Sequence, residues 1–498
     1  MEANLLCEQL CCQTLVFSEK QTREETAETV VPDTMPDIAE LLDADARVYL
    51  RSKEIRDGKV TAEAQIAGTI LYLGEEDCNV QRIELNMPCA FSFDMEEPKE
   101  DDKVIVRLRV INADARSLNP RKLLLRTDVR IDLSVYRAEC LPITAGAEER
   151  EGMQTLISEE TVTYASAVTE KSFVISEELA FSPGSPAIGK ILLSETDAAV
   201  EEIKSVGGKL ILQGTAGVDI LYLSEGENEL HRERLTAPFS QIIDTEEGAA
   251  AEVYPLLTAS YTEPLPESYG VTGIHLEMHM SAQVLCRRSR DIRYLADAYS
   301  VKEPCSVRSD TLILPTTERE TVLRETLRES AELAREAGEI VSCRVFLGAA
   351  GECEGGVSLP VSIHVLYKTE NGDLAGTSLR RSVTFAMDTP ENAILRFGDA
   401  KIGETVVTPS GSSIEVRMSV EIPVLLWEKK EITMLTAVEL DEETPLRKNS
   451  TPSVIVVRYK EGSIWSLAKK YASTAALIES ANPFPIQFDD LLLIPRAR

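Results

Sequence analysis

A repeat with an offset of 150 residues constrains the fold of this chain more than any other feature. Four landmarks obey the offset without a gap: Pro36 and Pro186, Gly58-Lys59 and Gly208-Lys209, Ile70-Leu71-Tyr72-Leu73 and Ile220-Leu221-Tyr222-Leu223, and Pro88 and Pro238. A repeat of this kind indicates that one structural unit is used more than once. The chain must therefore fold as copies of a unit rather than around a single core.

The pattern inside each copy is that of a strand. Apolar residues alternate with polar ones before and through each tyrosine landmark, which is the period of a half-buried strand. An acidic turn follows at 74–77 and at 224–227, and each turn predicts a hairpin tip. The alternating residues are Val60, Ala62, Ala64, Ile66, Ile70 and Tyr72 in the first copy, and Leu210, Leu212, Ala216, Val218, Ile220 and Tyr222 in the second.

A third, diverged copy follows the second. Tyr367 lies 145 residues after Tyr222, and Asn371-Gly372 then gives a strong hairpin signal because both residues tolerate positive φ. Further alternating runs close the three copies. We therefore predict a mainly β chain with three repeated β-sandwich-like domains, at 1–150, 151–310 and 311–440.

Helix is predicted at only a few places in these domains. Short helical turns are expected at 38–42 and 188–192. A charged segment, 317–337, places Leu323, Leu327, Ala331 and Ala334 on one helical face. Residues 441–452 are polar and contain proline, which predicts a flexible linker from which the C-terminal residues 453–498 hang.

Residues 453–498 have the pattern of a small βααβ module. Val454–Val457 predicts a strand, Ser463 and Thr474 are placed to cap two short helices, and Leu491–Ile494 predicts the second strand. Asn482-Pro483 ends the second helix because proline cannot continue its hydrogen bonds.

This module resembles the LysM family, whose members bind glycans that contain N-acetylglucosamine, such as peptidoglycan. The resemblance implies a binding site at Gly462, Ser463, Ile464, Trp465, Asn482 and Pro483. Two departures fall near the glycan groove of the family. Gly462-Ser463-Ile464-Trp465 is one residue shorter than the usual Gly-Asp-Thr-Leu-Trp, and Phe488-Asp489-Asp490 replaces Pro-Gly-Gln. Trp465 and Tyr471 can also be read as core residues of a tiny domain.

The repeated units resemble the SPOCS domain of sporulation and spore-coat proteins, through the 208–223 block and Ala115–Leu123. SPOCS units combined with a LysM module resemble the SipL-type coat morphogenetic proteins. The resemblance implies action in the mother cell and binding to the ATPase of the coat basement layer, of the stage IV sporulation protein A type.

The composition limits the kinds of partner that the protein can bind and the places where it can act. The net charge is −31; residues 453–498 contain six basic and four acidic residues, which leaves −33 on the rest of the chain. Such an acidic body repels nucleic acid. No apolar stretch reaches the roughly 20 residues of a membrane span. The first residues lack the basic start of a secretion signal, so we expect a cytoplasmic protein, peripheral at the forespore surface.

Ten cysteines are scattered along the chain and are expected to stay reduced in the cytoplasm. The cluster Cys7, Cys11 and Cys12 lacks zinc-site spacing and a nearby histidine. No metal and no cofactor are expected.

Two segments imitate catalytic or binding motifs. Gly184–Ile191 fits a phosphate-binding loop except at its last position, where Ile191 replaces the hydroxyl residue that meets magnesium. His275 and His279 are four residues apart, but the residues between them alternate as in a strand, which puts the histidines on a polar strand face. With no nucleophile motif, we expect no catalytic residues and no enzyme.

Two functions are consistent with these patterns. The first is a non-enzymatic scaffold of spore envelope and coat assembly that docks through its LysM module, where the changed loop at Ser463 favours a protein ligand over a sugar. The alternative is a peptidoglycan-binding, cell-wall-associated protein or a cryptic hydrolase.

Overall fold

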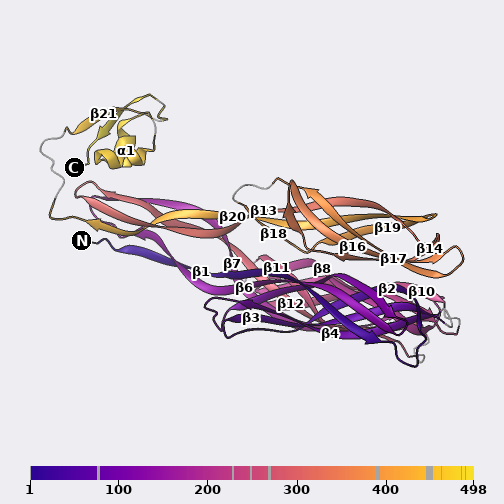
Figure 1. Cartoon of the computed structure of the whole chain (residues 1–498). Helices are drawn as coiled ribbons and strands as arrows, with labels where there is room; N and C mark the ends of the chain where they lie inside the picture. The colour runs from indigo at the N-terminus through magenta and orange to yellow at the C-terminus, as the bar shows by residue number, and fades with distance from the viewer. Residues whose placement is uncertain are drawn as a thin grey trace.

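The chain folds almost entirely into antiparallel sheets (Figure 1), as the alternation predicts. The computed structural model describes residues 2–497 except 76–78, 227–228, 247–249, 267–270, 389–392, 445–451, 461, 484 and 488; at 314–319, 393–394 and 427–430 it describes the backbone alone. The second half of the turn at 74–77 and the last residue of the turn at 224–227 lie outside the described residues.

The first two units share one topology, in which two three-stranded sheets face each other. In unit 1 the sheets are β1-β6-β5 and β2-β3-β4, and in unit 2 they are β7-β12-β11 and β8-β9-β10. Every one of the alternating residues named above is buried. The strands are β1 (Leu5–Val30), β2 (Ile38–Arg56), β3 (Lys59–Gly74), β4 (Val80–Asp94), β5 (Lys103–Asn119), β6 (Lys122–Ala147), β7 (Met153–Ala180), β8 (Ile188–Val206), β9 (Lys209–Ser224), β10 (Leu230–Asp244), β11 (Ala250–Pro264) and β12 (Gly273–Ser300).

Unit 3 repeats this topology with two of its strands divided. β14 and β15 share one edge of β16, while β17 pairs with its other edge. β18 and β19 likewise pair with one edge of β20, whose other edge pairs with β13. The strands are β13 (Cys305–Glu332), β14 (Ala337–Leu347), β15 (Gly351–Cys353), β16 (Gly356–Thr369), β17 (Leu374–Ala386), β18 (Ala393–Phe397), β19 (Lys401–Ser410) and β20 (Ser413–Leu440).

The three landmark tyrosines have one structural role. Tyr72, Tyr222 and Tyr367 are fully buried in their sandwiches, and each hydroxyl donates to a backbone carbonyl where the chain crosses between sheets. The acceptors are Pro36 O at 3.1 Å, Pro186 O at 3.3 Å and Arg335 O at 3.4 Å. The repeat thus preserves a buried ring whose polar end is satisfied.

The first and last strands of each unit extend beyond the sandwich as a two-stranded ribbon. A bulge marks the same place on the first strand of each unit, at Val16, Ser166 and Glu318, as the gaps in the strand registers show. A bulge bends a strand and increases its twist. The three ribbons pack together into a stalk whose core includes Leu10, Ile143, Val162, Ile292, Ile432 and Met434.

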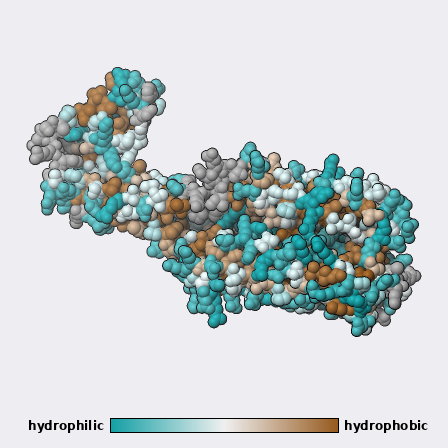
Figure 2. All heavy atoms as spheres, viewed as in Figure 1, coloured by the Kyte–Doolittle hydropathy of each residue, from teal (hydrophilic) through white to brown (hydrophobic). Residues whose placement is uncertain are grey.

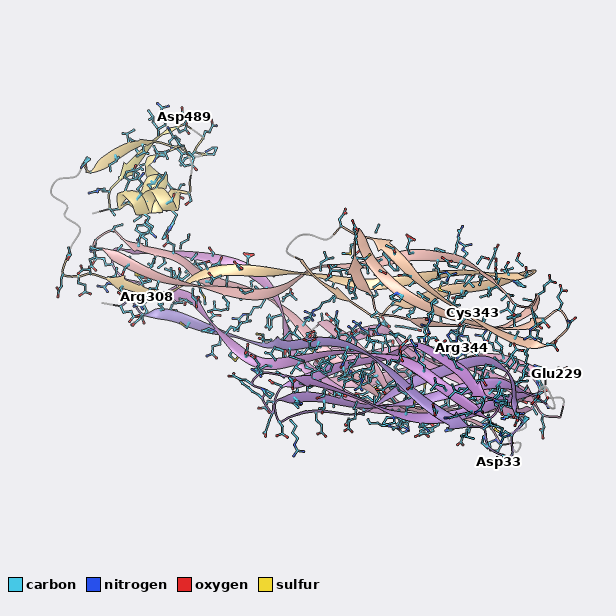
Figure 3. All side chains as sticks on the ribbon, viewed as in Figure 1. Asp33, Glu229, Arg308, Cys343, Arg344 and Asp489 are labelled. Atoms are coloured by element: carbon cyan, nitrogen blue, oxygen red, sulfur yellow. A yellow bond between two sulfur atoms is a disulfide. The ribbon has the colours of Figure 1, made fainter. Side chains whose placement is uncertain are left out.

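The three sandwiches also contact one another, and residues at equivalent positions of the three units meet at this contact. Leu71, Leu221 and Leu366, which hold equivalent positions, lie in one buried cluster. Beside it lies a buried ionic cluster in which Arg344 of unit 3 contacts Asp45 of unit 1 and Glu195 of unit 2. Figure 3 shows Arg344 where unit 3 faces unit 1. The body is therefore three units packed into one assembly.

Three helix predictions are wrong. Residues 38–42 and 188–192 begin strands β2 and β8, and 317–332 belongs to β13. In the last case the misleading signal has a simple cause. Leu323, Leu327 and Ala331 are four apart, a spacing that suits one face of a helix and also one face of a strand. Pairing with β20 selects the strand, and Ala334 is exposed.

The C-terminal module has the predicted βααβ order, with β21 (Val454–Arg458), α1 (Ile464–Tyr471), α2 (Ala475–Ala481) and β22 (Leu491–Pro495). β21 and β22 pair antiparallel as a two-stranded sheet, and Ala468, Ile478 and Ile494 fill the space beneath it.

Candidate functional site

The local geometry of the module follows from a few polar residues. Ser463 caps α1 by accepting the backbone N–H of Ser466, and Thr474 caps α2 by accepting that of Leu477, both at 3.2 Å. Gly462 has φ of +111°, which side chains rarely tolerate, and a Cβ there would lie 2.9 Å from Ser466 Oγ. Gly462 and Ser463 thus set the start of α1, and both are exposed.

Asn482 holds the module together from inside. Its side chain is buried, and Nδ2 donates to the carbonyls of Ile478 and Leu493, both at 2.7 Å. The N–H of Leu493 donates back to Oδ1 at 2.8 Å. The amide therefore joins the end of α2 to β22, whereas Pro483 beside it is exposed. Of the six predicted site residues, Ser463 and Asn482 therefore use their side-chain polar atoms in hydrogen bonds within the module.

Trp465 points at the body of the protein. Its indole Nε1 donates to Asp297 Oδ2 at 2.8 Å, and its ring meets that of Tyr299 edge-on, with centroids 4.8 Å apart. Lys469 Nζ lies 2.6 and 2.8 Å from the two oxygens of Asp297. The hydroxyl of Tyr299 donates to the carbonyl of Ser473 at 2.8 Å. Asp297 and Tyr299 belong to β12, at the end of the stalk.

The linker composition predicted a module that hangs free of the body. The structure shows instead that the module contacts the body. Figure 1 shows it next to the ends of the stalk strands. Tyr299 and Val301 of the body join Ala468, Ile478 and Ile494 of the module in one buried apolar cluster. We call this part of the body, Asp297–Val301, the stalk tip. Most of the linker, 445–451, lies outside the described residues.

The electrostatics of the contact favour an ionised Asp297. Burial raises the pKa of Asp297, but hydrogen bonds from Lys469 and Trp465 outweigh it and hold the pKa below its ordinary value. Burial also raises the pKa of Tyr299 to about 12, so its hydroxyl stays a donor. Sequence reasoning missed both residues, because only the packing of two distant segments brings them to the module.

The module has a second exposed feature, an apolar face. Val454 and Val456 on β21 and Leu491 and Leu493 on β22 are between 43% and 62% exposed, and they share the outer face of the sheet. Figure 2 shows apolar atoms on the module in the region of β21. Apolar residues gathered on a small exposed sheet are typical of contact surfaces.

The two motif-like segments have no catalytic geometry. β8 begins at Ile188, so a strand stands where a phosphate-binding loop leads into a helix. His275 and His279 lie on the half-exposed face of β12, as predicted, and His279 Nε2 is 2.6 Å from Glu277. Among the residues that the structure describes, no group of three or more His, Cys, Asp or Glu side chains is arranged to hold a metal ion.

The expectation that the cysteines stay reduced is wrong for one pair. Cys11 on β1 lies directly opposite Cys140 on β6, with Cα atoms 4.0 Å apart, and the two form a disulfide. Sequence spacing could not reveal this pair, because strand pairing brings together residues 129 positions apart.

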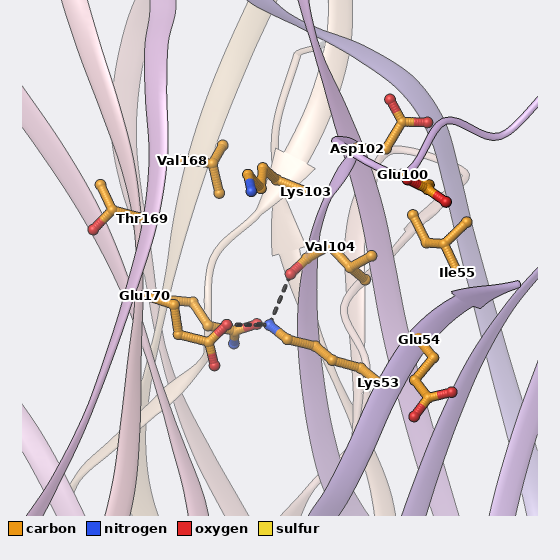
Figure 4. A pocket seen from close by; sticks show the side chains of 11 residues that line it. Lys53, Glu54, Ile55, Glu100, Asp102, Lys103, Val104, Val168, Thr169 and Glu170 are labelled. Carbon is orange, nitrogen blue, oxygen red and sulfur yellow. Dashed lines mark hydrogen bonds and ion pairs between the residues drawn. The ribbon is translucent and has the colours of Figure 1, made fainter.

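A cavity of about 490 Å³ lies between units 1 and 2 (Figure 4), and the amine of Lys53 in its lining is bonded to groups of both units. Lys53 Nζ lies 2.7 Å from Glu170, 2.7 Å from Gln283 Oε1 and 2.8 Å from the carbonyl of Val104. Burial lowers the pKa of Lys53, and Glu170 opposes that shift. These contacts join two units and leave the amine engaged.

Neither helix of the described chain is long and apolar enough to cross a membrane.

Comparison with known proteins supports the family suggested by the repeat. The family model described as SipL, SPOCS domain, matches residues 37–118 and 187–260. These segments run from the start of β2 to the end of β5 in unit 1, and over the equivalent strands β8 to β11 in unit 2. No curated protein and no solved structure matches the chain. With the matched segments in two of its three repeated units, the chain is a SPOCS-domain, SipL-like protein.

Proposed function

We propose that this protein is a non-enzymatic scaffold of spore envelope and coat assembly. In this role the three units form a rigid platform in the mother cell, peripheral to the forespore surface, and the LysM-like module at one end docks on a partner. The SPOCS match supports a sporulation-related role. The packing of three units through shared apolar and ionic clusters supports a platform.

One observation carries the docking role: the module stands at the end of an elongated body with its own exposed contact surfaces. Gly462, Ser463 and Pro483 face solvent, and the outer sheet face is apolar. The partner that fits the family is the coat basement-layer ATPase, of the stage IV sporulation protein A type. An apolar surface favours a protein over a glycan, whose hydroxyls require polar contacts.

The test compares the full chain with a chain that ends at Thr444, which keeps the three units and lacks the module. Each is presented to the immobilised ATPase and to purified peptidoglycan. We expect the ATPase to retain the full chain and release the shortened one. Retention of the full chain by peptidoglycan alone would overturn the protein-docking proposal. A peptidoglycan zymogram checks the alternative, since a cleared band that a carboxylate substitution abolishes would reveal a hydrolase.

A further inference from the structure

Two roles compete for one side chain. Trp465 belongs to the predicted ligand site of the module, yet its indole N–H and its ring are both engaged by the stalk tip. A ligand that accepts the indole N–H, or that stacks on the part of the ring against Tyr299, needs the surface that Asp297 and Tyr299 occupy. The two contacts are therefore mutually exclusive at this residue.

The contact between module and stalk tip is specific. Lys469 places its amine on both oxygens of Asp297, while the Trp465 N–H takes one of them, so the carboxylate receives two charge-assisted hydrogen bonds and an indole one. Tyr299 adds a hydrogen bond to the Ser473 carbonyl and a largely buried ring. Specific interfaces combine apolar packing with hydrogen bonds in this way.

The path of the chain does not enforce this contact. The module follows unit 3, whose last strand β20 ends at Leu440, whereas Asp297 and Tyr299 lie in unit 2. Thirteen residues, 441–453, separate Leu440 from β21, and an extended chain of that length spans about 40 Å. The module therefore finds the stalk tip through complementary side chains, and charge assists it, since the module is net positive and the body carries −33.

We propose that the stalk tip is an intramolecular docking site that covers the Trp465 face of the module, so that a partner gains Trp465 only when the module leaves the tip. This inference rests on the proposed docking function of the module. A partner that requires the released state binds the full chain more weakly, by the fraction of molecules in which the module is free. If the module is free in about one molecule in ten, the apparent Kd rises about tenfold.

The experiment uses the full chain with Asp297→Lys, which turns the ion pair with Lys469 into a repulsion. Asp291→Lys is the matched control, because Asp291 is an exposed carboxylate on the same strand that bonds Thr161 and not the module. Release is measured first, without a partner, as an increase in the radius of gyration by small-angle scattering. In a Trp427→Phe background, the red shift of Trp465 emission reports the same event.

Partner affinity is then measured with the coat ATPase as the probe. We expect Asp297→Lys to release the module and to lower the apparent Kd about tenfold, with Asp291→Lys unchanged in both respects. Release without a gain in affinity would overturn the competition, and would place the partner on the outer sheet face instead. No change in scattering or emission would overturn the docking itself. If neither the wild type nor either variant binds the ATPase, the proposed function is refuted. The release measurements still show whether the module docks on the stalk tip.

Discussion

Asp45 of unit 1 and Arg344 of unit 3 form a buried ion pair, with Oδ1 and Nη1 2.8 Å apart. The two residues hold equivalent places on β2 and β14, and Glu195 holds that place on β8, with its Oε1 3.2 Å from Arg344 Nε. Three copies of one position thus meet, and one of them is basic where the others are acidic. The repeat diverged in charge where identical residues would repel one another.

Replacing Arg344 with methionine should destabilise the body strongly. The change leaves Asp43, Asp45 and Glu195 without their shared cation, and an uncompensated buried charge typically costs about 3–5 kcal/mol. Urea unfolding followed by circular dichroism measures the loss. Arg324→Met is the control, because that side chain is 70% exposed in its pair with Glu421 and should change stability by less than about 1 kcal/mol. Equal effects of the two variants would contradict a stabilising role for the cluster.

The pH dependence of stability should include a contribution from Asp132. Burial raises the pKa of this carboxyl, but Arg109, Arg107 and Arg130 outweigh burial and hold the pKa below its ordinary value. A depressed folded-state pKa gives stability that is present above the unfolded value of about 3.9 and is lost as pH falls through the folded value. Asp132→Asn should therefore destabilise the protein at pH 7, and part of this difference from the wild type should disappear below about pH 4.

Unfolding midpoints of the two proteins between pH 3 and pH 7 supply this comparison. Asp399→Asn is the control, since Asp399 lies 3.5 Å from Arg107 and Arg109 but is 55% exposed. A difference between Asp132→Asn and the wild type that stays constant over the whole range would rule out the linkage.

Removing one tyrosine hydroxyl tests the role of the repeated landmark. Tyr222→Phe keeps the buried ring and deletes the hydrogen bond to the Pro186 carbonyl, so we expect a loss of about 1 kcal/mol. Tyr261→Phe should have little effect, because Tyr261 is 57% exposed. Thermal unfolding monitored by calorimetry separates the two. If Tyr222→Phe leaves the stability unchanged, the buried ring alone explains why tyrosine recurs at this position.

The landmarks show which parts of the fold could be predicted. The alternation around Tyr72 and Tyr222 predicts the strands, because burial on one sheet face is a local pattern. The helix predicted at 317–337 is wrong, because a spacing of four residues fits both a helix and a strand. Only pairing with β20, which is remote in sequence, resolves it.

The candidate site also has a part that local sequence predicts and a part that only the packing of distant segments creates. Ser463 and Thr474 were found as caps because capping is a local interaction. Asp297 and Tyr299 were not found, because their role exists only once unit 2 and the module are packed together. The contact between Asp45, Glu195 and Arg344 is also non-local. Their equivalent positions in the repeat predict it only once the three units are known to pack together.

The disulfide between Cys11 and Cys140 should stabilise the stalk. It closes a loop of about 129 residues, for which the loss of unfolded-state entropy corresponds to about 5 kcal/mol at most. The double substitution Cys11→Ser and Cys140→Ser should lower the unfolding midpoint, and reductant should do the same to the wild type. Cys353→Ser, at an exposed free cysteine, is the control. Mass spectrometry of the unreduced protein that finds both thiols free would exclude the bond.

Asn482 should be a determinant of module folding. Asn482→Ala removes three hydrogen bonds to the main chain and leaves the N–H and carbonyl of Leu493 without this partner, a loss of about 3 kcal/mol. A module of 46 residues has little stability in reserve, so this loss should unfold it in a large fraction of molecules. Pro483→Ala, next in sequence and exposed, should leave the module folded.

The emission of Trp465 in a Trp427→Phe background reports the state of the module, while circular dichroism reports the strands of the body. We expect Asn482→Ala to shift the emission and to leave the sheet signal nearly unchanged, because its contacts all lie within the module. Loss of partner binding in Asn482→Ala with the emission of a folded, docked module would place Asn482 in the ligand site rather than in the core. A simultaneous collapse of the sheet signal would show that the module stabilises the three units as well as docking on them.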